Sequence, residues 1–307
     1  MNIIVQPDHG VGPVLAALRK ANKSIDIMIF RLDIQEMRKA LAAAVARGVN
    51  VRALIAHTNR GGEKSLRKLE QGLLEAGVTV SRTADDFLRY HGKMMVIDDK
   101  ALHLYGFNFT WIDIERSRSF GLVLKHKRLV QEAKKLFEAD TARQPYSASY
   151  DRFVVSPENA RDRLTAFIKG TRKQLLIYDP KVSDPAVLRL LKERAKAGVD
   201  VRIIGKVAGA ATGILSEPYV GKRLHVRAMV QDGRKLFLGS QSLRRLELDK
   251  RREIGVIVDD KKAVSEIARA FEADWALTPT GKAPAADAEA AEKAEAKELK
   301  EEVEISA

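Results

Sequence analysis

The stretch RYHGKMMVIDDKALHLYGFNFT, residues 89–110, places two basic side chains, His91 and Lys93, at the head of the apolar run 94–97. The turn signal DDK follows the run, which therefore predicts a short buried strand. Alternate residues of a strand share one face, so His91 and Lys93 are expected to point toward one spot from a rigid element. A single H-x-K tripeptide arises by chance, and its meaning depends on the rest of the chain.

The same pattern recurs in RLHVRAMVQDGRKLFLGSQSL, residues 223–243. There His225, Arg227 and Asp232 each stand 134 residues after His91, Lys93 and Asp98. The flanks repeat at the same offset, since RSFGLVL at 118–124 parallels REIGVIV at 252–258, and LFEADTA at 136–142 parallels AFEADWA at 270–276. Because both motifs occupy cognate positions of an internal repeat, they indicate a functional pair.

The first half carries an insertion. ARGVNVRALI at 46–55 matches KAGVDVRIIG at 196–205 with an offset of 150, so 16 additional residues precede the first motif. They lie in HTNRGGEKSLRKLEQGLLEAGVTV, residues 57–80. This segment predicts a glycine-hinged loop, an amphipathic helix and an extra strand.

Helical and strand-like segments alternate in both halves, which predicts an α/β fold with helices packed on sheet faces. The expected helices are 11–22, 34–48, 127–140, 158–170, 185–198 and 261–274, and the expected strands are 24–30, 49–55, 174–180 and 199–205. We place the repeats at 1–147 and 148–278. The remainder, 279–307, is rich in Ala, Glu and Lys and has no aromatic residue, which predicts a disordered tail or a single solvated helix.

The net charge of +13 is distributed unevenly. Residues 281–307 hold four lysines and eight acids, a net charge of −4, which leaves +17 on the rest of the chain. A strongly basic chain of this kind favours binding to nucleic acid, to an anionic membrane surface or to a phosphate-bearing substrate. The absence of cysteine excludes disulfides and thiolate chemistry. No signal peptide and no apolar run of the ~20 residues that span a bilayer are evident, so we expect a cytoplasmic protein, peripheral at most at the inner face of the membrane.

Two imidazoles that met across a pseudo-two-fold axis would suit phosphodiester chemistry. A neutral histidine can act as the nucleophile, and a protonated one can donate to the leaving oxygen. Lys93 and Arg227 would neutralise the anionic phosphate. The remaining histidines lack metal-site spacing, and we expect neither a metal nor a cofactor; they are His9, His57, His103 and His126.

Both motifs resemble the signature of the phospholipase D superfamily, which is H-x-K, four residues, D, six residues, then G-G/S-x-N/S. The resemblance covers residues 1–278. It implies a duplicated α/β fold with mixed sheets flanked by helices, in which both motifs form one active site on a pseudo-two-fold axis. It also implies a covalent phosphohistidine intermediate that water or an alcohol resolves.

The resemblance assigns roles by position. His91 and His225 would be the nucleophile and the acid/base, and family precedent favours His91 as the nucleophile. Glu253 resembles the acid that orients one imidazole. The phosphate oxygens would be held by Lys93, Arg227, Asn108 and Ser242, and the two motif aspartates, Asp98 and Asp232, would be structural.

Three positions depart from the family pattern. Arg227 replaces the second motif lysine with a broad planar fork, which is not a conservative change at a tight site. Tyr105 stands where glycine is usual before Gly106. Ser119 occupies the cognate place of Glu253, so one histidine is expected to lack a carboxylate partner.

The leading interpretation is a metal-independent phosphodiesterase or phosphatidyltransferase that acts on phospholipids, similar to the cardiolipin synthase and phospholipase D branches, with a phospholipid or an anionic membrane surface as partner. Phe107, Phe109 and Trp111 follow the motif and are candidates for lipid contact or for core packing. The first alternative is a nuclease or DNA-end phosphodiesterase of the same superfamily, with nucleic acid as partner. The second is a catalytically degenerate phosphate- or nucleic-acid-binding scaffold. No obligatory protein partner is expected.

Overall fold

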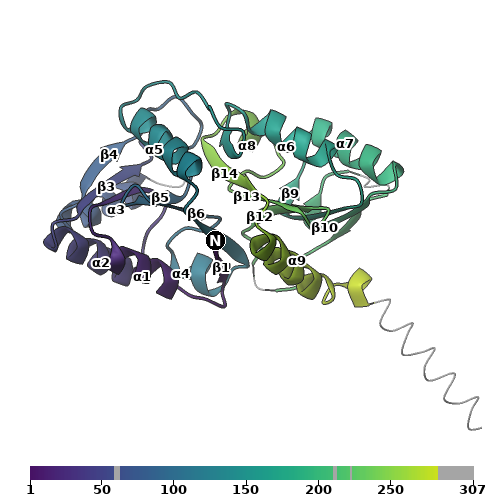
Figure 1. Ribbon diagram of the computed structural model, residues 1–307, viewed down its shortest axis with the longest axis horizontal. Helices are drawn as coiled ribbons and strands as arrows, with labels where there is room; N and C mark the ends of the chain where they lie inside the picture. Colours follow the sequence, from purple (N-terminus) through teal and green to yellow (C-terminus); the bar gives the residue numbers. More distant parts are fainter. Residues whose placement is uncertain (59–62, 210–212, 222, 283–307) are drawn as a thin grey trace, which may run out of the picture.

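The computed structural model describes residues 1–282 except 59–62, 210–212 and 222, and it consists of two similar halves (Figure 1). Each half contains one seven-stranded sheet. The strands of the first sheet are β1 Asn2–Gln6, β2 Ser24–Met28, β3 Asn50–Ile55, β4 Thr79–Arg82, β5 Met94–Ile97, β6 Ala101–Tyr105 and β7 Ser119–Leu124. Those of the second are β8 Phe153–Ser156, β9 Gln174–Val182, β10 Asp200–Val207, β11 Leu215–Glu217, β12 Arg227–Gln231, β13 Lys235–Gly239 and β14 Glu253–Val258.

Both sheets are mixed and have the same topology. The order is β1-β7-β6-β5-β2-β3-β4 in the first and β8-β14-β13-β12-β9-β10-β11 in the second. In the first sheet β2, β3 and β4 pair in parallel, whereas β5, β6 and β7 form an antiparallel meander. The duplicated α/β fold with mixed sheets is therefore confirmed.

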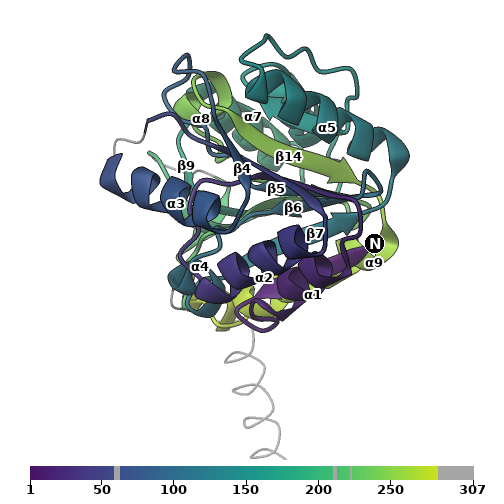
Figure 2. The same cartoon turned by 90° about the vertical axis from the view of Figure 1, so that its left-hand side faces the viewer.

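Helices cover both faces of each sheet, as Figures 1 and 2 show for α1 and α2 on one face of the first sheet and α5 on the other. The helices are α1 Gly12–Lys20, α2 Gln35–Ala46, α3 Glu63–Glu75, α4 Trp111–Glu115, α5 Lys127–Thr141, α6 Ala160–Lys169, α7 Pro185–Lys196, α8 Arg245–Asp249 and α9 Lys261–Trp275. A strand covered on both faces needs apolar side chains at every position. In β5, Met94 and Val96 accordingly enter the core under α5, and Met95 and Ile97 enter the core under α1 and α2.

The core under α5 is shared by the two repeats. It continues from β5, β6 and β7 through β12, β13 and β14 to α9. The two motif strands, β5 and β12, therefore stand on opposite sides of one apolar centre, which fixes the distance between the motifs.

Backbone hydrogen bonds join each motif to the other repeat. His91 N donates to Arg252 O at 2.8 Å, and Arg252 N donates to Arg89 O at 2.9 Å. The symmetry-related bonds join residues 134 positions later or earlier, namely His225 N to Arg118 O at 3.1 Å and Arg118 N to Arg223 O at 2.8 Å. Each catalytic candidate is thus held in place by the opposite half of the chain.

Reciprocal ion pairs, one buried and one partly buried, reinforce this junction. Arg252 Nη2 of the second repeat lies 3.0 Å from Asp140 Oδ1 of the first. Arg118 Nε of the first lies 2.9 Å from Asp274 Oδ2 of the second. Both aspartates belong to the repeated FEAD segments, so each repeat supplies the same residue to the interface between the two halves.

The motif aspartates fasten the strand turns. Asp98 Oδ1 accepts the backbone N–H groups of Lys23 at 2.7 Å and Ser24 at 3.1 Å. Asp232 Oδ1 accepts those of Lys173 at 2.7 Å and Gln174 at 3.0 Å. Desolvation would raise the pKa of both carboxyls, but these bonds outweigh it and lower the pKa. This geometry agrees with the structural role expected for them.

The expected helices and strands are present with ends shifted by a few residues, and the insertion forms α3 as predicted. The strand expected after this helix is present as β4, but it is not additional to the second repeat, because β11 occupies in the second sheet the edge that β4 occupies in the first. The glycine-hinged loop and the tail lie outside the described residues, apart from 57–58 and 279–282. The division at 147/148 falls between α5 and β8 and stays a prediction.

Candidate active site

The first motif histidine is buried at the entrance to β5. Its Nδ1 lies 2.9 Å from Oε2 of Glu253, which is fully buried at the start of β14. The Phe30 ring meets the imidazole edge-on with centroids 5.1 Å apart. Burial lowers the pKa of His91 well below its ordinary value, and the charges of Lys93 and Arg227 lower it further. The ring is therefore neutral near pH 7, as a nucleophile must be.

Glycine between the two basic residues of the first motif allows its neighbours to pack closely. A β-carbon at Gly92 would overlap the Ile254 side chain and Met28 Sδ. The close approach of β14 to this point brings Glu253 under the imidazole. A Gly92 substitution would therefore displace the pair that orients His91.

The second motif histidine also has a carboxylate partner. His225 Nδ1 lies 3.5 Å from Asp113 Oδ2 in α4, an ion-pair distance rather than a close hydrogen bond. Ser119, which replaces the expected acid, donates from Oγ to the His225 backbone oxygen at 3.1 Å. The expectation that one histidine lacks a carboxylate is therefore wrong, because α4 brings Asp113 to the place that Ser119 leaves open.

Asp113 and its cognate Glu247, 134 residues later, were not identified from the sequence. Asp113 Oδ2 accepts Asn108 N at 2.8 Å and Asn108 Nδ2 at 2.7 Å, and Glu247 Oε2 accepts Ser242 N at 2.7 Å. Each acid thus holds the motif residue that is expected to contact phosphate. The signal was present, since both acids lie five residues after those motif residues.

Lys93 is the most deeply buried cation of the site, with 1% of its surface exposed. Its Nζ donates to the His91 backbone oxygen at 2.7 Å. Burial lowers the pKa of Lys93 to about 7. An anion bound here would offset that penalty and favour the charged amine.

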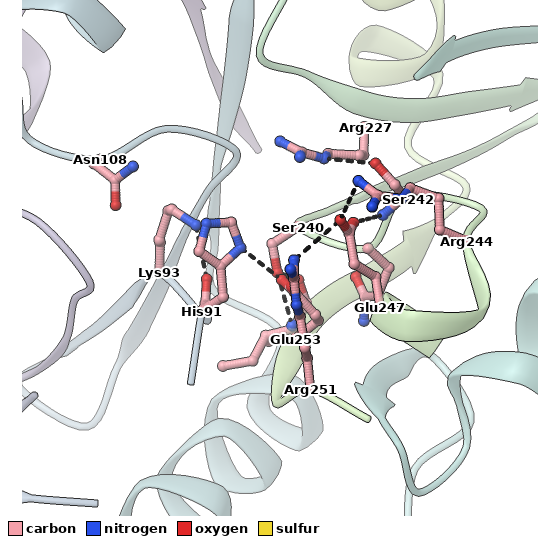
Figure 3. Close-up of polar contacts among 12 residues, drawn as sticks. His91, Lys93, Asn108, Arg227, Ser240, Ser242, Arg244, Glu247, Arg251 and Glu253 are labelled. Carbon is pink, nitrogen blue, oxygen red and sulfur yellow. Dashed lines mark hydrogen bonds and ion pairs between the residues drawn. The ribbon is translucent and has the colours of Figure 1, made fainter. Parts of the chain in front are cut away.

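Arg227 approaches from the second repeat, and Figure 3 shows it with Ser242 on the side opposite His91 and Lys93. Its Nε donates to Ser242 Oγ at 3.1 Å. Its Nη1 is buried without a hydrogen-bond partner in the described part of the chain, as is Oδ1 of Asn108. Buried polar atoms are usually paired, so the Arg227 donor fits a contact to an anionic ligand, whereas Asn108 Oδ1 can only accept from a donor group.

The cations act on both imidazoles. Lys93 and Arg227 each lower the pKa of His91 and of His225, after the larger effect of burial. All four side chains therefore share one electrostatic environment, although they come from motifs 134 residues apart. The fold brings together the residues expected to form the site and leaves Asp98 and Asp232 at the far ends of β5 and β12.

The other histidines stand apart from this constellation. His9 Nδ1 accepts Val5 N at 3.0 Å, His103 is buried beside the Tyr105 hydroxyl, and His126 stacks on Tyr150. Burial lowers the pKa of His103 to about 4. Among the described residues, no group of three or more His, Cys, Asp or Glu side chains is arranged to hold a metal ion.

Two of the three aromatic candidates for lipid contact are core residues. Phe107 and Phe109 are fully buried and pack around Tyr105. Trp111 is 56% exposed on α4, and Ile112 beside it is 49% exposed. Tyr105 packs in the hydrophobic core beneath the motif. Across the described ranges, no helix is both long enough and apolar enough to traverse a bilayer.

Comparisons with known proteins agree with this geometry. The family model described as "Cardiolipin synthase, PLD-like domain" matches residues 14–141 and 164–275. No curated protein matches. A polyphosphate kinase from Porphyromonas gingivalis superposes with a TM-score of 0.74 at 19% identity, over 88% of this chain and 49% of that one. This chain thus spans about half the length of the kinase.

A phosphatidylserine synthase from Haemophilus influenzae Rd KW20 superposes with a TM-score of 0.68 at 11% identity, over 90% of this chain and 86% of that one. Identities this low establish a common fold only. The family match covers most of the chain and includes both motifs. The chain therefore belongs to the phospholipase D superfamily, in the family of cardiolipin synthase-like PLD domains.

Proposed function

We propose that this protein is a metal-independent phosphodiesterase or phosphatidyltransferase that acts on phospholipids through a phosphohistidine. The observation that carries the proposal is the pair of buried imidazoles, each with its own carboxylate, beside Lys93 and Arg227. This set supplies a nucleophile, an acid and charge neutralisation from side chains alone.

In the first step, Glu253 accepts a hydrogen bond from Nδ1–H of neutral His91, which leaves the Nε2 lone pair free. Nε2 attacks phosphorus, an N–P bond forms, and the bond to the leaving oxygen breaks. Protonated His225 gives its proton to that oxygen. In the second step, neutral His225 takes a proton from water or an alcohol, whose oxygen attacks phosphorus and breaks the N–P bond.

The negative charge of a bound substrate favours protonation of His225, the general acid. In the free site, burial and the two cations lower the pKa of His225, while Asp113 opposes this effect. A bound phosphodiester offsets Lys93 and Arg227 with its own negative charge. The protonated state of His225 then becomes accessible near pH 7, which general acid catalysis requires.

Three observations support a phospholipid substrate. The family description names cardiolipin synthase, and one neighbour of the same fold is a phosphatidylserine synthase. The charge of +17 outside the tail attracts anionic bilayers, at ~1 kcal/mol per basic residue near the surface. Trp111 and Ile112 lie exposed on α4, three and four residues after the motif residue Asn108.

A nuclease or DNA-end phosphodiesterase is the second candidate. The same positive charge suits a polyanion held through counterion release. The burial of Phe107 and Phe109 in the core also removes two of the three candidate lipid contacts. A non-catalytic binding scaffold is the third candidate, and it predicts binding without turnover.

The test presents labelled phosphatidylglycerol and phosphatidylethanolamine in vesicles and in detergent micelles to the wild type and to His91→Asn. Headgroup release or transfer by the wild type alone supports the proposal. Nicking of plasmid DNA in EDTA, with no lipid turnover, identifies the second candidate. Equal binding by both proteins without turnover of either substrate identifies the scaffold.

A further inference from the structure

Two arginines lie on one aromatic ring next to the nucleophile candidate. Phe30, just beyond β2, contacts the His91 ring. The guanidinium carbons of Arg31 and Arg89 lie 5.6 and 5.2 Å from the Phe30 ring centroid. Within the described part of the chain, neither arginine forms an ion pair. Two like charges thus both lie on the face of one aromatic ring without a paired carboxylate.

The cognate arginine of the second repeat has a carboxylate partner. Arg223, 134 residues after Arg89, pairs with Asp113 and donates to Ser117 Oγ at 3.1 Å. Arg89 is half-buried and lacks such a partner. Burial and the neighbouring charges of Arg251 and Arg31 lower the pKa of Arg89, whereas Glu253 opposes them. Among the described residues, the motif arginine therefore lacks a paired carboxylate on the His91 side and has one on the His225 side.

A cavity of about 380 Å³ borders Phe30 and Arg31 and is lined further by residues of α3, within the size range of small-molecule sites. Its floor is apolar and includes Phe30, Leu66 and Leu69. Its charged lining residues are Arg31, Arg38, Lys68 and one acid, Asp33. Asp33 Oδ1 already accepts Trp111 N at 3.2 Å. The cavity is therefore cationic overall, and α3 belongs to the insertion that the second repeat lacks.

We propose that Arg31 and Arg89 form a second anion subsite beside His91, which takes a further phosphate group of the substrate while Lys93 and Arg227 hold the reacting one. The inference rests on the proposed function for the identity of the reacting phosphate. The substrate class is a phosphodiester that carries another phosphoryl group, attached directly as a pyrophosphate or through a sugar. A diester with a single phosphate leaves this subsite unused.

The kinetic test uses two chromogenic diesters, thymidine 5′-(p-nitrophenyl phosphate) and its 3′-phosphorylated form. We expect the wild type to prefer the second by about ten- to hundredfold in kcat/KM, as charge-assisted hydrogen bonds typically supply. In Arg31→Gln and in Arg31→Gln/Arg89→Gln the preference should fall toward one. Arg19→Gln removes the same charge from an exposed position on α1 and should keep the preference. A preference that survives in the double variant would overturn the subsite.

Binding measured by calorimetry separates this inference from turnover and distinguishes the two phosphate linkages. The ligands are orthophosphate, pyrophosphate and thymidine 3′,5′-bisphosphate, titrated into the wild type and the same three variants. The subsite is supported if either doubly phosphorylated ligand binds at least tenfold tighter than orthophosphate to the wild type and to Arg19→Gln but not to the double variant. Equal affinities in the wild type, or no binding, would overturn it. If a doubly phosphorylated ligand binds at least tenfold tighter than orthophosphate as described but neither diester is hydrolysed, the proposed function is refuted and the subsite is supported.

Discussion

Replacement of Glu253 by glutamine tests how the first imidazole is activated. The substitution keeps the shape of a fully buried side chain and removes its charge. Glu253 Oε2 is 2.9 Å from His91 Nδ1, so it stabilises the positive charge that develops on the ring as Nε2 attacks phosphorus. Glutamine can also present its amide N–H to Nδ1, which would favour the wrong tautomer.

The distance limits the size of the effect. Unit charges 2.9 Å apart at an effective dielectric of about 20 attract by about 6 kcal/mol, which is an upper bound because only part of the charge develops in the transition state. Arg251, 3.8 Å from Glu253 Oε1, already offsets some of the carboxylate charge. We therefore expect kcat to fall by about 10²–10⁴-fold, or roughly 3–5.5 kcal/mol.

The assay follows nitrophenolate release from bis(p-nitrophenyl) phosphate, with kcat and KM determined separately. Rapid mixing should show a slower first turnover, because formation of the phosphohistidine is the impaired step. Glu272→Gln is the matched control, since its carboxylate pairs with Arg202 at 2.9 Å on α9, away from the pocket. A Glu253→Gln enzyme with near-normal kcat and a raised KM would refute the assigned role.

Asp113→Asn should reduce turnover of alkyl diesters far more than that of nitrophenyl diesters, since a good leaving group needs little help from His225; equal losses would contradict this role. The lowered pKa of Lys93, about 7 against an ordinary 10.5, means that the unfolded state binds more protons between these values. The free energy of unfolding should therefore gain a positive slope with pH in this window, and urea titrations of Lys93→Met should lack that slope. Phosphate should stabilise the wild type more at pH 6 than at pH 9, in thermal melts. Arg252→Ala leaves its buried carboxylate partner unpaired and should cost about 3–5 kcal/mol in urea unfolding, whereas Arg152→Ala at an exposed pair should cost at most about 1 kcal/mol.

Much of the site could be predicted from the spacing of residues in the sequence. The offset of 134 identified the paired motifs, and it would also have identified Asp113 and Glu247 had it been followed through the short segments after each motif. Those segments form α4 and α8, five residues each, which are too short to show helical periodicity. Strands β1 and β8 were not predicted, because each half was expected to begin with its first helix.

Other features had no sequence signal. The ring of Phe30 lies 61 positions before His91, and nothing in the local pattern of either residue indicates their contact. The pairing of His225 with Asp113 depends on the angle at which α4 leaves the motif strand. Only packing decides such distances, because side chains far apart in the chain meet through the sheets that carry them.

The amino-acid sequence by itself determined the duplication, the α/β class and the types of side chain at the site. These features depend on local hydrophobic periodicity and on a motif that occurs in both halves of the chain. Tertiary structure alone decided which acid serves which imidazole and which arginine is left without a counter-charge. The reason is that His91 is held by Arg252 and Glu253 of the other repeat, so the environment of each motif is set by the half of the chain that does not contain it.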